Sequence, residues 1–464
     1  MIPLPNTIKE LHALVRQLLA ENEVLKARIA ELTAQVHADS HNSHKPPTSD
    51  GLRKRPALPK PLLGKKGGQP GHRGKTLKMV DHPDQTITCS PERCGCGASL
   101  RNTPGTIVER RQVFDLPEPK LRVTEYHRLR CQCPRCGQVQ EGTFPAQVQA
   151  PTQYGTGVFA LATLLNTAYT IPFKKIQGIF ADLFGYAVNE STVVTANTTC
   201  YEALAPSQAI INSQVVASAV GHFDETGIRV AGKLYWQHVA STPSATSLFV
   251  HPHRGVSALQ SEQSLFPIYH GWAVHDCWAS YFAFTACHHA LCGAHLLREL
   301  TALHEQGTRW AAQMHTVLMR LYRASDFGRG CVKYPQRWST LYDVLCHRAQ
   351  QEEPPPQRTH PNGKRKRTKG RNLLERLIKY KAAVLAFAFY PEVPFTNNQA
   401  ERDLRPVKIK QKITGGFRTL LGAQHYARIY SFVSTTRKHG RHVFKELRNV
   451  FLGHSFLLEP VVAK

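Results

Sequence analysis

The stretch AVGHFDETGIRV, residues 219–230, decides the fold, because it reads as a β-strand that carries acidic residues in its middle. β-Branched and aromatic residues recur through it, which predicts a strand. A carboxylate such as Asp224 among apolar neighbours is costly unless it is paired or bound to a cation. We therefore expect this strand to present Asp224 to a functional site. Glu225 should point to the opposite face and is not expected to be a further ligand.

Further strands and helices follow this one in a recognisable order. They are predicted strands at 234–240 and 247–251, a helical stretch near 257–265, strands at 271–276 and 289–292, and a long helix from about Leu296. A meander of three strands, then helix, strand, strand and helix, is the order of a ribonuclease H-like α/β fold. Other mixed folds share that order, so order alone does not decide between them.

Two more acidic residues complete a candidate site. Asp276 closes the strand 271–276, and Glu401 lies in TNNQAER, residues 396–402, where a helix with an asparagine cap would place it in the first turns. Three hard oxygen ligands suit two Mg²⁺ or Mn²⁺ ions, which promote phosphoryl transfer. The alternative is structural, with Asp276 as a turn residue and Glu401 paired with Arg405.

A cluster of cysteines between Cys89 and Cys136 predicts a structural zinc site within a module at 85–150. The expected ligands are Cys94, Cys96, Cys133 and Cys136, and Cys89 and Cys131 are alternative ligands. Two thiolate pairs on turns supply the four soft ligands of a closed tetrahedral Zn²⁺ site. A short hairpin is expected between them, over 108–126. The alternative is that these thiols bind no metal.

Residues 6–37 carry a leucine-zipper pattern. Ile8, Val15, Asn22, Ile29 and Val36 occupy the a positions of the heptad, and Leu11, Leu18, Leu25 and Leu32 occupy the d positions. β-Branched a residues with leucine at d favour a parallel dimer, and a lone asparagine at a fixes its register. We therefore expect self-association through this coiled coil. The alternative is an amphipathic helix that packs on its own domain.

The charge of the chain points to nucleic acid. Lys and Arg number 59 against 33 Asp and Glu, a formal net charge of +26, which indicates a polyanionic partner. A Pro/Gly-rich basic linker at 41–80 suits phosphate contacts without base reading. The expected DNA contacts are Arg53, Lys54, Arg55, Lys65 and Lys66 in this linker, and Arg402, Arg405, Lys408, Lys410 and Lys412 after the acidic site. The alternatives are a solvated linker and a solvated basic helix face.

The rest of the chain reads as helices. Residues 151–215 are compatible with a helix-turn-helix-like DNA module, although packed helices alone would give the same pattern. The catalytic region is expected at 216–420 with a helical insertion at about 300–390, and a helical segment at 421–464 follows. Cys292-x-x-His295 has no evident partner pair and is interpreted as core. His295 and Arg298 are second-tier candidates for DNA contact.

Several blocks in order resemble the insertion sequence 66 family of bacterial transposases. They are FDETG at 223–227, HDCW at 275–278, HALCGAHLLREL at 289–300 and TNNQAER at 396–402, with NSHKPP at 42–47, GGQPGH at 67–72, the cysteine knuckles and the zipper upstream. The resemblance covers nearly the whole chain. It departs at His44, where serine is commoner, and at Cys94-x-Cys96, where Cys-x-x-Cys is commoner.

The resemblance implies a DDE-type transposase with Asp224, Asp276 and Glu401 as the metal-binding catalytic triad. Such an enzyme binds the terminal inverted repeats of its element, cleaves DNA and joins the ends to a target, with accessory proteins of the same element as further partners. Two rivals are a ribonuclease H-like nuclease without joining activity and a non-catalytic zinc-containing DNA-binding protein.

The sequence also sets expectations for location. Its longest apolar stretch, residues 158–171, is too short and too polar to span a bilayer. The opening residues do not read as a secretory signal. We expect a cytoplasmic, DNA-associated bacterial protein that does not bind membranes.

Overall fold

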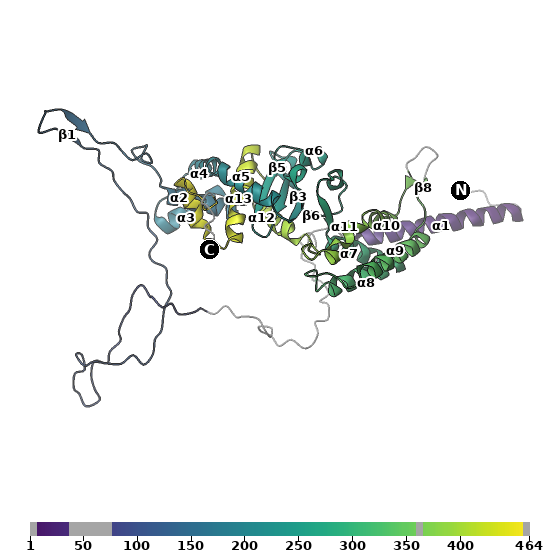
Figure 1. Cartoon of the computed structure of the whole chain (residues 1–464), viewed down its shortest axis with the longest axis horizontal. Helices are drawn as coiled ribbons and strands as arrows, with labels where there is room; N and C mark the ends of the chain where they lie inside the picture. Colours follow the sequence, from purple (N-terminus) through teal and green to yellow (C-terminus); the bar gives the residue numbers. More distant parts are fainter. Residues whose placement is uncertain (1–6, 37–76, 359–364, 458–464) are drawn as a thin grey trace. The chain divides into compact units, whose positions relative to one another are not determined.

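The computed structural model describes residues 7–36, 77–358 and 365–457 (Figure 1). These residues fall into two compact units. One holds the described residues of 7–36, 126–182 and 186–457, and the other holds 77–125 with 183–185. The predicted DNA contacts of the linker, from Arg53 to Lys66, lie outside the described residues. Within the described residues, no helix combines the length and apolar character that a bilayer crossing requires.

A mixed sheet with strand order β5-β4-β3-β6-β7 forms the centre of the larger unit. The strand β3 (Val220–Val230) pairs antiparallel with β4 (Lys233–Ser241), and β4 pairs antiparallel with β5 (Thr246–His251). On its other side β3 pairs in parallel with β6 (Trp272–His275), which pairs in parallel with β7 (His288–Leu291). All five predicted strands are confirmed, each within one residue of its expected bounds.

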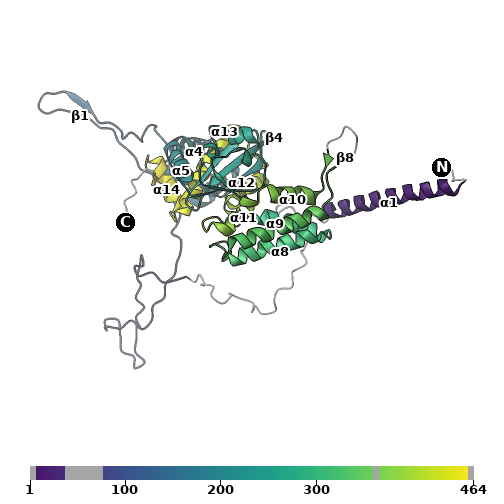
Figure 2. The ribbon, with the colours of Figure 1, turned by 45° about the vertical axis from the view of Figure 1, so that its right-hand side comes forward.

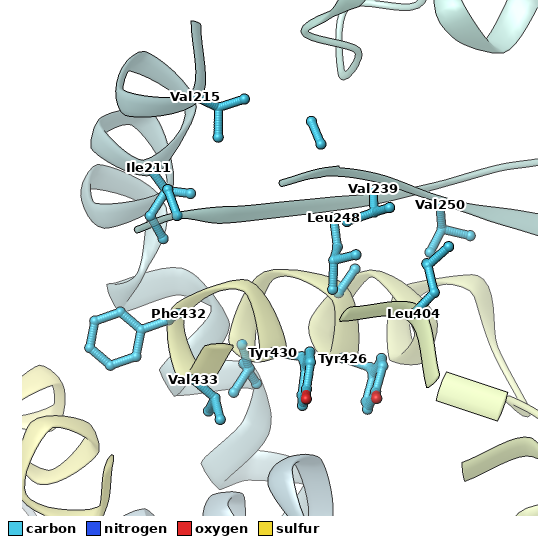
Figure 3. Packing of buried hydrophobic residues seen from close by; sticks show 14 of the residues in the cluster. Ile211, Val215, Val239, Leu248, Val250, Leu404, Tyr426, Tyr430, Phe432 and Val433 are labelled. Carbon is cyan, nitrogen blue, oxygen red and sulfur yellow. The ribbon is translucent and has the colours of Figure 1, made fainter. Parts of the chain in front are cut away.

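Helices on one side of the sheet belong to the same hydrophobic core as the strands. They are α2 (Thr156–Thr163), the π-helical turn η2 (Leu164–Ala168), α4 (Glu190–Ala203), α5 (Ala205–Val216), α12 (Asn398–Thr414), α13 (Leu420–Lys438) and α14 (Val443–Phe451). A further helix, α3 (Phe173–Phe184), lies between η2 and α4 in the chain and buries Ile176 and Phe180. Figure 3 shows side chains of α5 and α13 gathered against Val239 and Leu248 of the sheet. The expected boundaries at 215 and 421 therefore do not separate independent cores, because each helix buries its apolar face on its neighbours.

A second hydrophobic core lies beside β6 and β7 and consists mainly of helices. These are α7 (Gly293–Glu305), α8 (Arg309–Ala324), α9 (Pro335–Glu352), α10 (Lys369–Lys379) and α11 (Lys381–Phe389). Figure 2 shows α8, α9 and α10 side by side, in agreement with their contacts. The short strands β8 (Gln357–Arg358) and β9 (Arg365–Lys366) pair in the basic loop before α10. The helical stretch expected near 257–265 is shorter, α6 (Val256–Leu259), and the 3₁₀ turns η3 (Phe266–Ile268) and η4 (Tyr281–Ala283) follow.

The amino-terminal zipper pattern forms one continuous helix, α1 (Ile8–Val36). Its a and d side chains are exposed, among them Leu18 at 50% and Leu25 at 60%. Apolar side chains in a stripe on an isolated helix are typical of a surface that is covered by a partner helix.

The predicted hairpin at 108–126 is wrong, because the described residues 104–129 carry no strand. Strands form instead around the second cysteine knuckle, where β1 (Arg130–Gln132) pairs with β2 (Val139–Glu141). Residues 108–126 alternate polar and apolar side chains, yet Val108 and Val123 are each more than 80% exposed. Alternation without a second layer to bury it does not stabilise a hairpin.

Candidate active site

Asp224 lies in the middle of the central strand β3, close to other acidic side chains. Its Oδ1 accepts a hydrogen bond from the amide of Glu225 at 2.9 Å. Burial raises the pKa of Asp224 well above its usual range, and the charges of Glu225, Asp276 and Glu401 add to the rise. Asp224 therefore lies near enough to both other predicted acids for their charges to disfavour its ionised form, an effect that a cation would relieve.

Asp276 follows directly after β6, the parallel neighbour of β3. Its Oδ1 accepts from the amide of Trp278 at 3.0 Å, which fixes the carboxylate at the strand end. Its Oδ2 lies 3.9 Å from a guanidinium nitrogen of Arg254. That guanidinium in turn lies over the rings of Trp278 and Trp236, 4.1 and 5.0 Å from their centroids. Asp276 is thus held from one side by backbone and from the other by a stacked arginine.

Glu225 is a buried acidic neighbour whose surroundings the sequence did not reveal. Its carboxylate accepts from Arg254 Nε at 2.7 Å and from the hydroxyl of Tyr281. Burial and the charge of Asp276 raise the pKa of Glu225, while Tyr281 and Arg254 lower it. Glu225 is therefore not an isolated side chain on the far face of the strand. It shares Arg254 with Asp276 and anchors that arginine at the site.

Glu401 reaches the site on the first turn of α12, as the sequence predicts. The residue before the helix, Asn397, does not cap it with its side chain. The side-chain amide nitrogen of Asn397 donates instead to the carbonyl of Phe223 at 2.8 Å, and its Oδ1 accepts from His222 Nδ1 at 3.0 Å. Burial lowers the pKa of His222 to about 4, so the ring is neutral at pH 7. Asn397 thereby ties the start of α12 to the strand that carries Asp224.

A buried polar network holds α12 against the sheet on the next turn. The carboxylate of Asp403 accepts from Ser241 at 2.5 Å and from Thr246 at 2.9 Å, and it pairs with Lys438 at 2.8 Å. These partners come from β4, from β5 and from α13. Because a buried carboxylate without its partners is costly, Asp403 fixes the helix that carries Glu401. The sequence offered no signal for this role beyond an acid two residues after Glu401.

The donor set of the three acids fits divalent cations that prefer oxygen. All three offer carboxylate oxygens, the ligands that Mg²⁺ and Mn²⁺ favour. They do not form a compact three-ligand cage within the part of the chain that the structure describes.

A compact group of potential ligands does occur beside the acids. Atoms of Cys292, His295 and Glu401 all lie within 4.8 Å of one another. His295 Nε2 is 4.0 Å from Glu401 Oε1. The interpretation of Cys292 and His295 as core residues alone is therefore incomplete, because the missing partner comes from a helix more than 100 residues later in the chain. Arg298, one turn further along α7, has a buried Nε with no hydrogen-bond partner among the described residues.

The basic residues after Glu401 divide into two kinds. Arg402, Arg405, Lys408 and Lys412 are exposed. Lys408 also donates to the carbonyl of Gly227 at 2.6 Å. Lys410 is only 8% exposed and lies over the rings of Phe417 and Tyr426. Burial lowers the pKa of Lys410 to about 8, so Lys410 is a packing residue and its expected DNA contact has no support in the structure.

The cysteine knuckles form two similar turns, and each belongs to a different unit of the chain. In the first, the amide of Cys94 donates to Ala98 and Gly97 has a positive φ of 93°. In the second, the amide of Cys133 donates to Gln138, and Gly137 has a φ of 73°.

Hydrogen bonds lower the pKa of a thiol in each knuckle. For Cys96 they come from the backbone of Ala98 and then from the Cys94 side chain. For Cys133 they come from the backbone of Cys136 and Arg135 and then from the Cys136 side chain. A lowered thiol pKa favours the thiolate form that Zn²⁺ binds, so Cys96 and Cys133 fit zinc ligands.

Comparisons with known proteins match three parts of the chain. A family model described as the transposase IS66 family matches residues 151–425. A model described as the zinc-finger binding domain of transposase IS66 matches residues 91–137. A model described as a family of unknown function matches residues 2–78. None of the curated proteins compared matches the chain.

Proposed function

Because the chain belongs to the IS66 transposase family, we propose that it is a DDE transposase whose catalytic residues are Asp224, Asp276 and Glu401. It binds the terminal inverted repeats of its insertion sequence, cleaves DNA there and joins the freed ends to a target. The observation that carries the proposal is the placement of the three acids: Asp224 lies in β3, Asp276 directly follows the neighbouring strand β6, and Glu401 lies in the first turn of α12, which packs on β3. The charges of Asp276 and Glu401 also raise the pKa of Asp224. Mutually repelling carboxylates beside a sheet are costly to maintain, and a cation site accounts for them.

The sheet order supports a ribonuclease H-like core. Its central strand has an antiparallel meander on one side and two parallel strands on the other. Asp224 lies in β3 and Asp276 directly follows the neighbouring strand β6, while Glu401 comes from a helix that packs on the sheet. This arrangement brings acids far apart in the sequence to one edge of the site.

The residues of the chain have distinct tasks in this mechanism. Asp224, Asp276 and Glu401 would hold the Mg²⁺ or Mn²⁺ ions through their carboxylate oxygens. When bound, the ions supply charge neutralisation and activation of the attacking oxygen. Arg254 and the Trp278 amide keep Asp276 oriented, and Asn397 keeps the start of α12 against β3. Orientation of this kind supplies much of the rate enhancement in phosphoryl transfer.

DNA binding is assigned to the exposed cations and to the zinc module. Arg402, Arg405, Lys408 and Lys412 follow Glu401 along α12 and are suited to neutralise phosphates. The partly buried Arg298 is a further candidate, since its Nε lacks a hydrogen-bond partner among the described residues.

The zinc module is proposed to hold one Zn²⁺ through Cys94, Cys96, Cys133 and Cys136. Helices α3 and α4 stay a candidate DNA module, and α1 is proposed to dimerise the enzyme.

A strand-transfer assay separates a transposase from a nuclease. The full-length protein is incubated with Mg²⁺, a target plasmid and short duplexes that end in the element's terminal repeat with a free 3′-hydroxyl. We expect covalently joined products, with duplexes of scrambled end sequence as the control. Cleavage without joining, with the element's other proteins present, would identify a nuclease. Specific binding without either reaction would identify a DNA-binding protein.

A further inference from the structure

Cys292, His295 and Glu401 bring three different donor types to one point. The thiol of Cys292 is buried, and the side chains of His295 and Glu401 are 21% and 28% exposed. Their sulfur, nitrogen and oxygen atoms lie within 4.8 Å of one another. The group therefore has a buried end at the sulfur and an end at Glu401 that solvent reaches.

Local structure forces this convergence. Cys292 ends β7 and precedes α7, and its Sγ accepts from the amide of Asn397 at 3.2 Å. The amide of Gly293 donates to the carbonyl of Phe395 at 2.8 Å. A Cβ at Gly293 would lie 2.2 Å from the Phe395 ring, so glycine is required for this close approach. The segment 395–397 is thus fixed against Cys292, and α12 starts with Glu401 directed toward His295.

The donor set differs from that of the three acids. One sulfur, one imidazole nitrogen and one carboxylate oxygen are ligands that Zn²⁺ accepts together, whereas Mg²⁺ takes oxygen ligands. Bonds of roughly 2.0–2.3 Å hold tetrahedral ligands about 3.3–3.7 Å apart. Closure around an ion therefore requires movements of about 1 Å, within reach of the partly exposed His295 and Glu401. Three protein ligands leave the fourth position open to water.

We propose that Cys292, His295 and Glu401 form a second zinc site, distinct from the zinc module and sharing Glu401 with the proposed catalytic acids. Zn²⁺ held by Cys292 and His295 competes with the Mg²⁺ site for the Glu401 carboxylate. Zinc bound here therefore withdraws Glu401 from catalysis. This second consequence rests on the proposed function, whereas the binding of zinc does not.

Zinc stoichiometry tests the site without any enzymatic readout. The metal-stripped full-length protein is titrated with Zn²⁺ by calorimetry, beside Cys292→Ser and His295→Ala. Cys346→Ser is the matched control, since Cys346 is also a buried cysteine but has no part in the group. We expect both site variants to bind one equivalent less than wild type and Cys346→Ser to bind as many.

Two variants keep the test decisive. If Cys292→Ser does not fold, as judged by circular dichroism, His295→Ala still reports on the site, because its side chain is partly exposed. Full stoichiometry in any folded site variant would overturn the three-ligand site.

Competition then tests the shared carboxylate. Added Zn²⁺ should suppress Mg²⁺-dependent strand transfer by wild type, and suppression should need at least tenfold more Zn²⁺ in His295→Ala. Equal sensitivity of the two proteins would overturn the shared role of Glu401. Absence of strand transfer by wild type without Zn²⁺ would instead count against the proposed function and leave the stoichiometry result intact.

Discussion

At the scale of single residues, Arg254 is the side chain on which two carboxylates depend. Its guanidinium lies 2.7 Å from the carboxylate of Glu225 and 3.9 Å from that of Asp276. The same guanidinium lies over two tryptophan rings. The Glu225 side chain has no solvent exposure, so water cannot replace the arginine there. Arg254 is thus a positioning residue that acts through Asp276.

Replacement of Arg254 by alanine should therefore both destabilise the protein and weaken divalent-ion binding. A buried carboxylate that loses its partner costs about 3 kcal/mol, and the partial exposure of Arg254 reduces that toward about 2 kcal/mol. Thermal unfolding and Mn²⁺ titration measure the two effects. Arg229→Ala, at an exposed arginine on the same strand as Glu225, is the control. Equal Mn²⁺ affinity in Arg254→Ala and Arg229→Ala would contradict a positioning role.

The lowered pKa of Lys410 predicts that the stability of the protein depends on pH. The folded protein disfavours the charged form, with a pKa of about 8 against an ordinary 10.5. Stability is therefore reduced below pH 8 and recovers as the pH rises from about 8 toward about 10.5. Lys410→Met should raise the free energy of unfolding at pH 7 by about 2 kcal/mol, and the excess should shrink toward pH 10.

Unfolding midpoints of wild type and variant across this pH range give the measurement. Lys412→Met, at an exposed lysine on the same helix, should show no such pH-dependent difference. A constant difference for Lys410→Met would mean that the pKa of the lysine is the same in the folded and the unfolded protein, and would contradict the lowered pKa.

Sequence reasoning was able to nominate the acids but not the groups that hold them. The sequence singles out Asp224, Asp276 and Glu401, because an acid in or after an apolar strand, or in the first turn of a helix, can be recognised from the residues around it. Arg254 and Tyr281 come from loops whose path depends on tertiary packing. Asn397 was expected to cap a helix, and its side chain binds a neighbouring strand instead, because the buried Phe223 carbonyl needs a donor.

At the scale of elements, the junction between β7 and α7 sets the position of α12. The amide of Gly293 and the thiol of Cys292 both bind the segment before α12. No side chain fits at 293 without displacing Phe395. The close packing of the β7–α7 junction against the segment before α12 therefore depends on glycine at position 293.

Gly293→Ala should displace the start of α12 and lower strand-transfer activity at least tenfold, while it destabilises the fold by about 1–3 kcal/mol through overpacking. Gly178→Ala is the matched control, because nothing lies within 4 Å of the added Cβ in α3. That control should gain up to about 1 kcal/mol from helix propensity. Chemical unfolding measures the change in stability, and the joining assay measures the change in strand transfer. Wild-type stability and activity in Gly293→Ala would show that Phe395 can move aside and does not fix the start of α12.

Elements with a buried face were predicted well, and elements without one were not. The five strands of the sheet each pack against helices and therefore need apolar side chains, and this apolar pattern predicts where each strand lies in the sequence. Residues 108–126 have a similar alternation but nothing to bury it, and no hairpin forms. The core that α2, α4 and α5 share with α13 and α14 was missed because contacts between distant helices leave no local sequence pattern.

At the scale of the whole molecule, the exposed stripe on α1 predicts a dimer. Leu18 occupies a d position in the heptad and Ala20 an f position on the opposite face, and both are exposed in the single chain. Leu18→Glu should dissociate the dimer because it places like charges in the seam. Ala20→Glu should leave the dimer intact. Sedimentation velocity of the full-length proteins measures both, and a monomeric wild type or equal effects of the two variants would contradict the zipper.

The proposed function requires that Asp224, Asp276 and Glu401 catalyse DNA cleavage at the ends of the element. The most direct measurement incubates the full-length protein with Mg²⁺ or Mn²⁺ and a plasmid that carries its gene with native flanks, and maps the nicks. We predict metal-dependent cuts at the element's ends by wild type and by the exposed-residue control Asp326→Asn. Asp276→Asn should cut roughly 10³-fold more slowly or not at all. Equal cutting by Asp276→Asn and wild type would contradict the account.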